Sequence, residues 1–377
     1  MWLRTFGPGL ALGVLSVIKF EPFGFAEEAT KRPPSTASSV FQKLTQQKFL
    51  DLSLIGSFAG SYFSDDPKDE VGAQPRRTGF SLQEIEVAVQ AIVDPYFRGD
   101  FFLAFGEEGG AFEEGYVSTT ALKGFQIRAG RLRGAFGRFN GKHTEFWDFV
   151  DQPLILARTF GVEGFREIGV HVDWLVPLPW FFLITAEALQ GKNDVAFKSN
   201  EKADFAYLAR IEQFFDLDDD TGLMLGLSAA HGGNPSFAWA KSTVYGADLL
   251  LRYRPSRYMK LSLQTEYLLH VREEKDADGL FRHVKEGGLY AELVWQFAQR
   301  WATAGRFDYV GLPAKTLEDG RDDTHFRGTA ALTFDPSEFS RLRVQYSVDK
   351  SAARDALAHE AHLQLIIVMG AHGAHAY

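Results

Sequence analysis

The stretch VYGADLLLRYRPSRYMKLSLQTEYLLHV, residues 244–271, shows the pattern that decides the fold. On its first arm every second residue is apolar or aromatic, as in Tyr245, Ala247, Leu249, Leu251 and Tyr253. After a turn that contains Pro255, the alternation resumes in Leu261, Leu263, Thr265, Tyr267 and Leu269. A period of two predicts β-strands, and arms of roughly 9–11 residues match a tilted strand that crosses a bilayer. A hairpin of a soluble sandwich would alternate in the same way, so the rest of the chain must separate the two folds.

The composition of the 377-residue chain allows a membrane barrel and excludes several other classes of protein. Aromatic residues make up 14% of the chain, yet after the N-terminus no apolar run approaches the ~18 residues of a spanning helix. The absence of cysteine excludes disulfides, thiolate metal sites and thiol catalysis. The formal net charge of −9, without a basic stripe, argues against nucleic acid as a partner.

The N-terminal residues predict export. Residues 1–26 combine a basic start and an apolar stretch with the small residues Gly24 and Ala26 at the positions that a signal peptidase reads. We therefore expect a signal peptide over 1–26, with a buried N-terminal helix as the alternative. Residues 27–48 are charged and rich in Pro and Ser, which predicts a flexible periplasmic segment and leaves 49–377 for the barrel.

The connections between the predicted strands alternate between tight and long. Tight turns such as Asp94-Pro95 and Asp335-Pro336-Ser337 follow every second strand, and longer polar segments such as 64–78 and 106–111 separate the others. Outer-membrane barrels alternate short periplasmic turns with long outer loops, whereas a soluble Greek-key sandwich does not. The chain therefore predicts an all-β fold, a transmembrane antiparallel β-barrel of about sixteen strands in the outer membrane of a Gram-negative cell.

Charged residues of both signs lie in the middle of the predicted strands, opposite the apolar face. Burying so many charges in a soluble core would cost far more than marginal stability allows, whereas a water-filled lumen solvates them. A barrel of about sixteen strands is wide enough for such a channel. We therefore expect the lumen to be lined by Glu84, Glu86, Arg98, Asp100, Arg128, Arg210, Glu212, Asp248, Arg252, Glu266, Glu292, Arg306, Asp308, Arg341 and Arg343.

The longest connection, residues 134–165, is too aromatic and apolar for a solvated outer loop. We expect it to fold into the barrel and narrow the pore; packing over the rim, or a subunit contact, is the alternative. The charged residues that would meet solute are Arg138, Lys142, Glu145, Asp148, Asp151 and Arg158.

Three arginines precede this loop. If the alternation holds, Arg128 faces the lumen, while Arg131 and Arg133 share the lipid-facing phase of Ile127. Either a bulge near Gly130 or a position at the rim is needed to keep these two charges out of lipid.

Residues 115–140, GYVSTTALKGFQIRAGRLRGAFGRFN, resemble the signature region of the phosphate-selective porin O/P type family. Gly130, Phe136 and Gly137 match its pattern of a strand with a central Gly followed by Phe-Gly before the long third loop. The resemblance covers one hairpin and the start of the loop. It implies a sixteen-stranded channel, commonly trimeric, that passes small anionic solutes. The dense ring of lysines expected in that family is missing here, and the predicted lumen is charge-balanced.

The C-terminal segment 370–377, GAHGAHAY, resembles tails of outer-membrane proteins described as zinc-regulated and receptor-like. His372 and His375 are its candidate metal ligands, but residues three apart in a strand point to opposite faces, so a tail that completes the last strand is the alternative.

Together these features predict an outer-membrane porin that passes small hydrophilic or ionic solutes by passive diffusion. We expect no cofactor and no enzymatic activity, because no hydrolase motif such as G-x-S-x-G is present. The expected partners are solutes or ions, outer-membrane lipid and further copies in a homotrimer. A substrate-specific or zinc-linked uptake channel, a barrel enzyme and an adhesin remain the alternatives.

Overall fold

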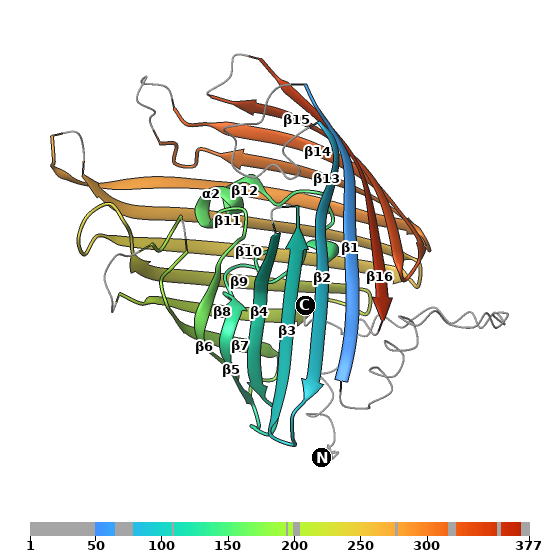
Figure 1. Ribbon diagram of the computed structural model, residues 1–377, viewed down its shortest axis with the longest axis horizontal. Coiled ribbons are helices and arrows are strands. Elements are labelled where there is room, and N and C mark those ends of the chain that lie inside the picture. Colours follow the sequence, from blue (N-terminus) through green and yellow to red (C-terminus); the bar gives the residue numbers. More distant parts are fainter. Residues whose placement is uncertain are drawn as a thin grey trace, which may run out of the picture.

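The chain forms a closed barrel of sixteen antiparallel strands, in which each strand pairs with its neighbours in sequence and β1 pairs with β16 (Figure 1). The computed structural model describes residues 50–64, 78–107, 109–193, 195–198, 204–275, 278–315, 322–352 and 356–370. The predicted fold class is confirmed. The signal peptide, the periplasmic segment, His372 and His375 lie outside the described residues.

The strands are β1 (Leu50–Phe63), β2 (Gly79–Ile92), β3 (Phe97–Gly106), β4 (Gly109–Thr119), β5 (Phe125–Arg133), β6 (Arg166–Leu175), β7 (Phe181–Leu189), β8 (Ala206–Asp216), β9 (Thr221–Gly233), β10 (Lys241–Ser256), β11 (Met259–Lys275), β12 (Phe281–Ala298), β13 (Trp301–Val310), β14 (His325–Ser337), β15 (Ser340–Ser351) and β16 (Ala358–Gly370). Two short helices, η1 (Thr144–Phe146) and α2 (Leu154–Phe160), lie between β5 and β6. Within the described part of the chain, no helix is both long and apolar enough to span a membrane.

The stretch of residues 244–271 forms the hairpin of β10 and β11. Tyr245 pairs with Leu269 and Asp248 with Glu266, so residues of like character face each other across the ladder. Tyr245 is 51% exposed on the outside, whereas Asp248 is 6% exposed on the inside. The period of two therefore assigned both faces correctly.

The outer face of the barrel is apolar along its circumference. Large hydrophobic side chains such as Phe58, Leu227, Phe307 and Leu363 are exposed on it. This arrangement is that of the lipid-facing surface of transmembrane barrels, because a water-facing sheet would not expose such a contiguous apolar band.

The short turns lie at one end of the barrel and most of the longer connections at the other. Leu50 at the start of β1 pairs with Ala91 beside the β2–β3 turn, and Gly370 at the end of β16 pairs with Ser53. The first and last strands thus begin and end at the short-turn end. The expected longer connection over 106–111 was wrong, because β3 continues to Gly106 and β4 already starts at Gly109.

The segment 134–165 is folded inside the barrel and carries α2 against its inner wall (Figure 1). The segment, called the inner loop below, packs with inward residues of β5 and β7 to β13 in a buried apolar cluster. The barrel thus has a hydrophobic core of its own, located within the lumen.

Candidate functional site

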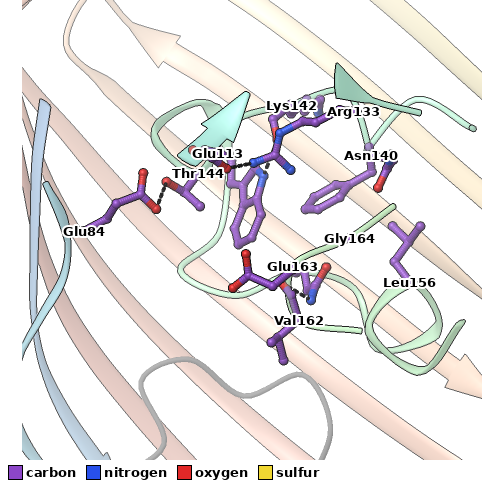
Figure 2. A pocket seen from close by; sticks show the side chains of 13 residues that line it. Glu84, Glu113, Arg133, Asn140, Lys142, Thr144, Leu156, Val162, Glu163 and Gly164 are labelled. Carbon is purple, nitrogen blue, oxygen red and sulfur yellow. Dashed lines mark hydrogen bonds and ion pairs between the residues drawn. The ribbon is translucent and has the colours of Figure 1, made fainter. Parts of the chain in front are cut away.

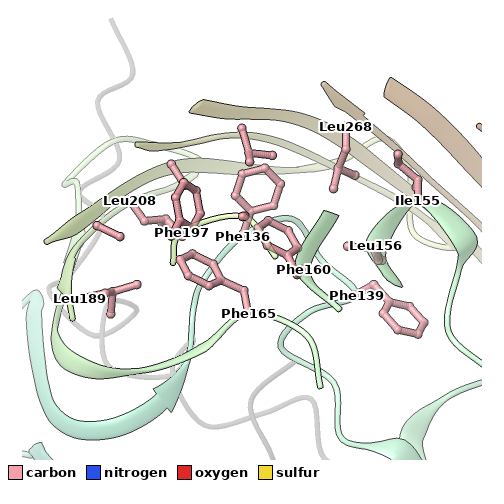
Figure 3. Close-up of a cluster of buried hydrophobic side chains, with 14 of the residues drawn as sticks. Phe136, Phe139, Ile155, Leu156, Phe160, Phe165, Leu189, Phe197, Leu208 and Leu268 are labelled. Atoms are coloured by element: carbon pink, nitrogen blue, oxygen red, sulfur yellow. The ribbon is translucent and has the colours of Figure 1, made fainter. Parts of the chain in front are cut away.

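Aromatic side chains pack within the inner loop and against one side of the wall. Within the loop, Phe160 and Phe165 stack with ring centroids 5.0 Å apart, and Phe136 meets Phe160 edge-on at 5.1 Å. Figure 3 shows these rings beside Leu208 and Leu268 of the wall. Phe139 meets Tyr290 of β12 edge-on at 6.1 Å. Because both partners are removed from water, this packing stabilises the loop position without any charge.

The first leg of the loop is held by a carboxylate on β11. Glu266 Oε1 accepts hydrogen bonds from the backbone N–H of Arg138 at 3.0 Å and of Phe139 at 2.6 Å. Gly137 precedes them at φ 61°, and a Cβ there would lie 2.2 Å from Glu266 Oε2. Glycine is therefore required at 137 both for the backbone conformation and for the approach of the carboxylate.

The loop then crosses the lumen. Lys142 Nζ lies 3.1 Å from Gln264 Oε1 on β11 and 3.7 Å from Glu292 Oε1 on β12. His143 Nδ1 lies 2.9 Å from Glu86 Oε2 on β2. Strands β2 and β11 are nearly half the circumference apart in the barrel order, so two consecutive residues contact opposite sides of the wall.

The second leg is held by buried ion pairs. The Asp151 carboxylate lies 2.8 Å from Arg306 Nη2 and 2.7 Å from Arg327 Nη1, and the Arg343 guanidinium donates to the Trp147 carbonyl at 2.6 Å. Burial alone would raise the pKa of Asp151, but Arg306 and Arg327 outweigh it and lower that pKa to about 2.

Helix α2 is attached to the wall near the end of the barrel that carries most of the long connections. Arg158 donates to both oxygens of Asp323, at 2.6 and 3.0 Å, and to Glu286 at 3.2 Å. A bidentate arginine–carboxylate pair fixes orientation as well as distance, so the helix is oriented against β12 and the β13–β14 connection.

Carboxylates from the wall surround His143. Its Nε2 lies 2.9 Å from Glu114 Oε1, and its Nδ1 lies 3.9 Å from Glu113 Oε2. Burial on its own would lower the pKa of His143, but hydrogen bonds with Glu114 and Glu86 raise it well above its usual range. Burial and the nearby Glu86 raise the pKa of Glu145 to about 8.

A pocket opens beside this group (Figure 2). Its lining mixes charges of both signs with polar and apolar groups, and comes from β2, β4, the end of β5 and both legs of the inner loop. The lining residues are Glu84, Glu113, Arg133, Phe139, Asn140, Lys142, Thr144, Trp147, Gln152, Leu156, Val162, Glu163 and Gly164.

The residues expected to line the pore lie on the inner face. The buried members are Glu86, Asp100, Arg210, Asp248, Glu266, Glu292, Arg306, Asp308 and Arg343, and the partly exposed ones are Glu84, Arg98, Arg128, Glu212, Arg252 and Arg341. Many neutralise one another, as in Arg210–Asp248 at 2.6 Å and Arg306–Asp308 at 2.8 Å. Ion pairing, which the sequence does not indicate, therefore compensates charges that the sequence analysis expects a watery lumen to solvate.

The charged residues of the inner loop divide in the same way. Arg138, Lys142, Asp148 and Arg158 are partly exposed, whereas Glu145 and Asp151 are buried between loop and wall. Asp151 thus fixes the loop through Arg306 and Arg327, whereas the Glu145 side chain makes no hydrogen bond to the described part of the wall.

The strand register shows which way Arg133 points. The β4–β5 ladder ends at the pair Gly115–Arg131, and the register of β3–β4 shifts where Glu113 is inserted. Beyond the end of that ladder Arg133 reaches the lumen and pairs with Glu113 and with Glu114. The bulge is therefore in β4 rather than in β5. Arg133, at the end of β5, lies near the rim of the barrel.

Sequence reasoning missed Glu113, Glu114, His143 and Arg327 as members of the site. The consecutive acids Glu113 and Glu114 interrupt the alternation expected of a strand, and this interruption was the available signal of a bulge. No comparable signal marked His143, because its partners lie on β2 and β4.

Solved outer-membrane barrels share this fold of a closed antiparallel barrel of sixteen strands. The anion-selective porin of Comamonas acidovorans superposes with a TM-score of 0.58 at 12% identity, covering 85% of this chain and 99% of that one. The outer-membrane channel DcaP of Acinetobacter baumannii gives 0.58 at 10% identity, covering 85% and 97%. OmpT of Vibrio cholerae, in a trimer form, gives 0.56 at 9%, covering 85% and 99%.

Sequence comparison adds a relative. The chain belongs to the same family as an uncharacterised protein of Aquifex aeolicus (strain VF5), to which it is 31% identical over 342 residues, covering 82% of this chain and 72% of that protein. No protein-family profile matches the chain.

Proposed function

We propose that the protein is an outer-membrane porin through which small hydrophilic or ionic solutes diffuse passively along a narrow path beside the inner loop. The observation that carries this proposal is the inner loop itself, which crosses a closed, polar-lined barrel and is held on opposite walls through Lys142 and His143. A loop held in this way narrows the cross-section of the lumen, whereas a separate domain inside the barrel would block it.

The pocket of Figure 2 is the proposed constriction. Glu84 and Glu163 bring negative charge to it, and Arg133 and Lys142 bring positive charge. Charges of both signs facing a narrow path favour small, well-hydrated solutes and give weak discrimination between anions and cations. Selectivity for phosphate, implied by the family resemblance, has no lysine ring to support it.

The remaining parts of the proposal concern assembly and chemistry. A homotrimer is consistent with the trimer form of the Vibrio cholerae fold neighbour and with the apolar outer face. No catalytic role is proposed, because the sequence contains no hydrolase motif such as G-x-S-x-G.

The test is single-channel recording in a planar bilayer, with full-length protein refolded in detergent. We expect discrete ohmic steps in KCl, and an increased anion preference in Glu84→Lys, because this residue lines the pocket. Asp219→Lys makes the same charge change at an exposed short turn between β8 and β9 and is expected to leave selectivity unchanged. Folded, heat-modifiable wild-type protein that gives no current steps contradicts the proposal.

A substrate-specific uptake channel is the second candidate, and the crossing of the lumen by the inner loop favours it. Such a channel binds its solute, so solute flux into liposomes saturates with concentration, whereas flux through a diffusion pore rises in proportion. The same refolded protein distinguishes the two.

A further inference from the structure

Three potential ligands of a metal ion converge where the inner loop meets β2 and β4. One donor atom from each of Glu86, Glu113 and His143 lies within 4.8 Å of the others, and all three residues are buried. His143 Nδ1 is 2.9 Å from Glu86 Oε2 and 3.9 Å from Glu113 Oε2. These separations bracket the distance of about 3.3 Å between ligands that share a tetrahedral zinc ion.

Buried carboxylate oxygens without hydrogen-bond partners favour a bound cation at the same place. Among the described residues, Glu86 Oε1 and Glu113 Oε2 are buried and accept no hydrogen bond. Glu86 is 1% exposed and Glu113 is 3% exposed. A buried carboxylate without partners is strongly unfavourable unless a proton or a cation compensates it.

The surroundings of His143 match those of a metal-binding imidazole. Its Nε2 lies 2.9 Å from Glu114 Oε1, so that in the metal-bound form the Nε2–H donates to this carboxylate, and the ion replaces the Nδ1 proton that otherwise donates to Glu86. Histidine ligands in proteins commonly donate their other N–H to a carboxylate, which fixes the tautomer and the ring orientation. Here Arg133 Nε, 3.1 Å from the same oxygen, holds that carboxylate in turn.

The second oxygen of Glu113 is also fixed. Its Oε1 pairs with Arg133 and lies 2.8 Å from Arg166 Nη1, which leaves Oε2 directed at the His143 side of the cluster. The arginines therefore orient the ligand and leave one of its oxygens unused.

We propose that Glu86, Glu113 and His143 bind a divalent transition-metal ion of the Zn²⁺ kind that fastens the inner loop to β2 and β4. One imidazole nitrogen among carboxylate oxygens suits Zn²⁺ better than Mg²⁺ or Ca²⁺, which prefer oxygen ligands throughout. The ion links three segments of the chain that are distant in sequence. This site does not depend on whether the barrel conducts.

The test measures Zn²⁺ binding to full-length, detergent-folded protein after removal of metal with EDTA. Isothermal titration calorimetry and metal analysis are carried out in a His372→Ala/His375→Ala background, so that the tail does not contribute. We expect one Zn²⁺ per chain and a rise in the unfolding temperature on adding Zn²⁺, with no comparable effect of Mg²⁺. Absence of stoichiometric binding in this background overturns the proposal.

Glu86→Gln is the decisive variant, because the amide keeps the shape of this ligand but removes its negative charge. It is expected to weaken Zn²⁺ binding at least about tenfold. Glu167→Gln changes a buried carboxylate on β6 that accepts from the Lys192 N–H and is expected to leave Zn²⁺ binding unchanged. Equal Zn²⁺ affinity in wild type, Glu86→Gln and His143→Gln, each folded by heat-modifiability, would refute the site.

Discussion

Lys142 and His143 are consecutive residues, yet the Lys142 ammonium lies 3.1 Å from Gln264 on β11 while the His143 imidazole lies 2.9 Å from Glu86 on β2. Because these strands are nearly half a circumference apart, one dipeptide bridges the lumen. The inner loop is therefore part of the interior of the barrel, and its contacts determine how much of that interior it fills.

Gly137→Ala is expected to loosen the first leg of the inner loop. The new Cβ would lie 2.2 Å from Glu266 Oε2 at a backbone φ of 61°, so both the carboxylate and the backbone must shift. We expect a loss of about 1–3 kcal/mol in the free energy of unfolding, measured by urea titration in detergent micelles.

Gly141→Ala is the matched control for this substitution. A Cβ at 141 meets nothing within 4 Å, so the free energy of unfolding should change by less than about 0.5 kcal/mol. Equal effects at the two glycines would contradict the role given to the contact with Glu266.

Asp151→Asn is expected to detach the second leg. The amide carries no charge and leaves Arg306 and Arg327, both buried, without their shared carboxylate. Removing one partner of a buried ion pair typically costs about 3–5 kcal/mol. Limited proteolysis of the folded barrel, with cleavage mapped by mass spectrometry, is expected to cut within 134–165 in this variant and not in wild type.

Asp148→Asn supplies the control, because it removes the same charge from a half-buried carboxylate of the same loop. Protection of the loop in Asp151→Asn equal to that in Asp148→Asn would show that the ion pairs do not hold it.

Low pH is expected to weaken the attachment of the second leg of the inner loop through Asp151. The pKa of Asp151 is lowered to about 2 in the folded protein, below the ~3.9 of an unfolded Asp. Its contribution of about 2–3 kcal/mol is therefore complete above about pH 5 and is lost as the pH falls toward 2. Unfolding free energies measured from pH 6 to pH 2 should decline more steeply in wild type than in Asp151→Asn, and parallel curves would exclude this assignment.

Arg158→Gln is expected to free helix α2 at the long-connection end. The variant loses the bidentate contact with Asp323 and the contact with Glu286. If the loop limits the path as proposed, the current becomes noisier and the mean conductance rises. Arg300→Gln, in the exposed short turn between β12 and β13, is expected to behave as wild type in the same bilayer recordings; noise in both variants alike would point to the detergent or bilayer instead.

The sequence predicted the barrel well because its determinants are local. Alternation over one strand fixed which way Asp248 and Tyr245 point, and the spacing of the turns fixed which strands are neighbours. The same rule misplaced nothing on β10 and β11. It left Arg133 undecided between a bulge and a position at the rim, because neither the one-residue bulge at Glu113 on the neighbouring strand nor the end of the β4–β5 ladder can be read from β5 alone.

The contacts of the inner loop were beyond prediction because they are not local. Asp151 meets Arg306 and Arg327, 155 and 176 residues further along the chain. Charge and position on the inner face identified Arg306 as lumen-facing, but no spacing rule connects it with Asp151. The cluster at His143 was missed for the same reason, since its ligands come from β2 and β4.

The order of these partners along the chain has a consequence for biogenesis. Residues 137–158 are made early, and Glu86 and Glu114 on β2 and β4 are made before them, yet many of the groups that neutralise and cover them lie on β9 to β15, in the second half of the chain. If strands pair in the order of the sequence, the inner loop cannot make these later contacts until the second half of the barrel has formed. Docking of the loop therefore becomes a late step that follows closure of the barrel. A barrel truncated before β13 would lack Arg306 and Arg327, the two arginines that pair with Asp151.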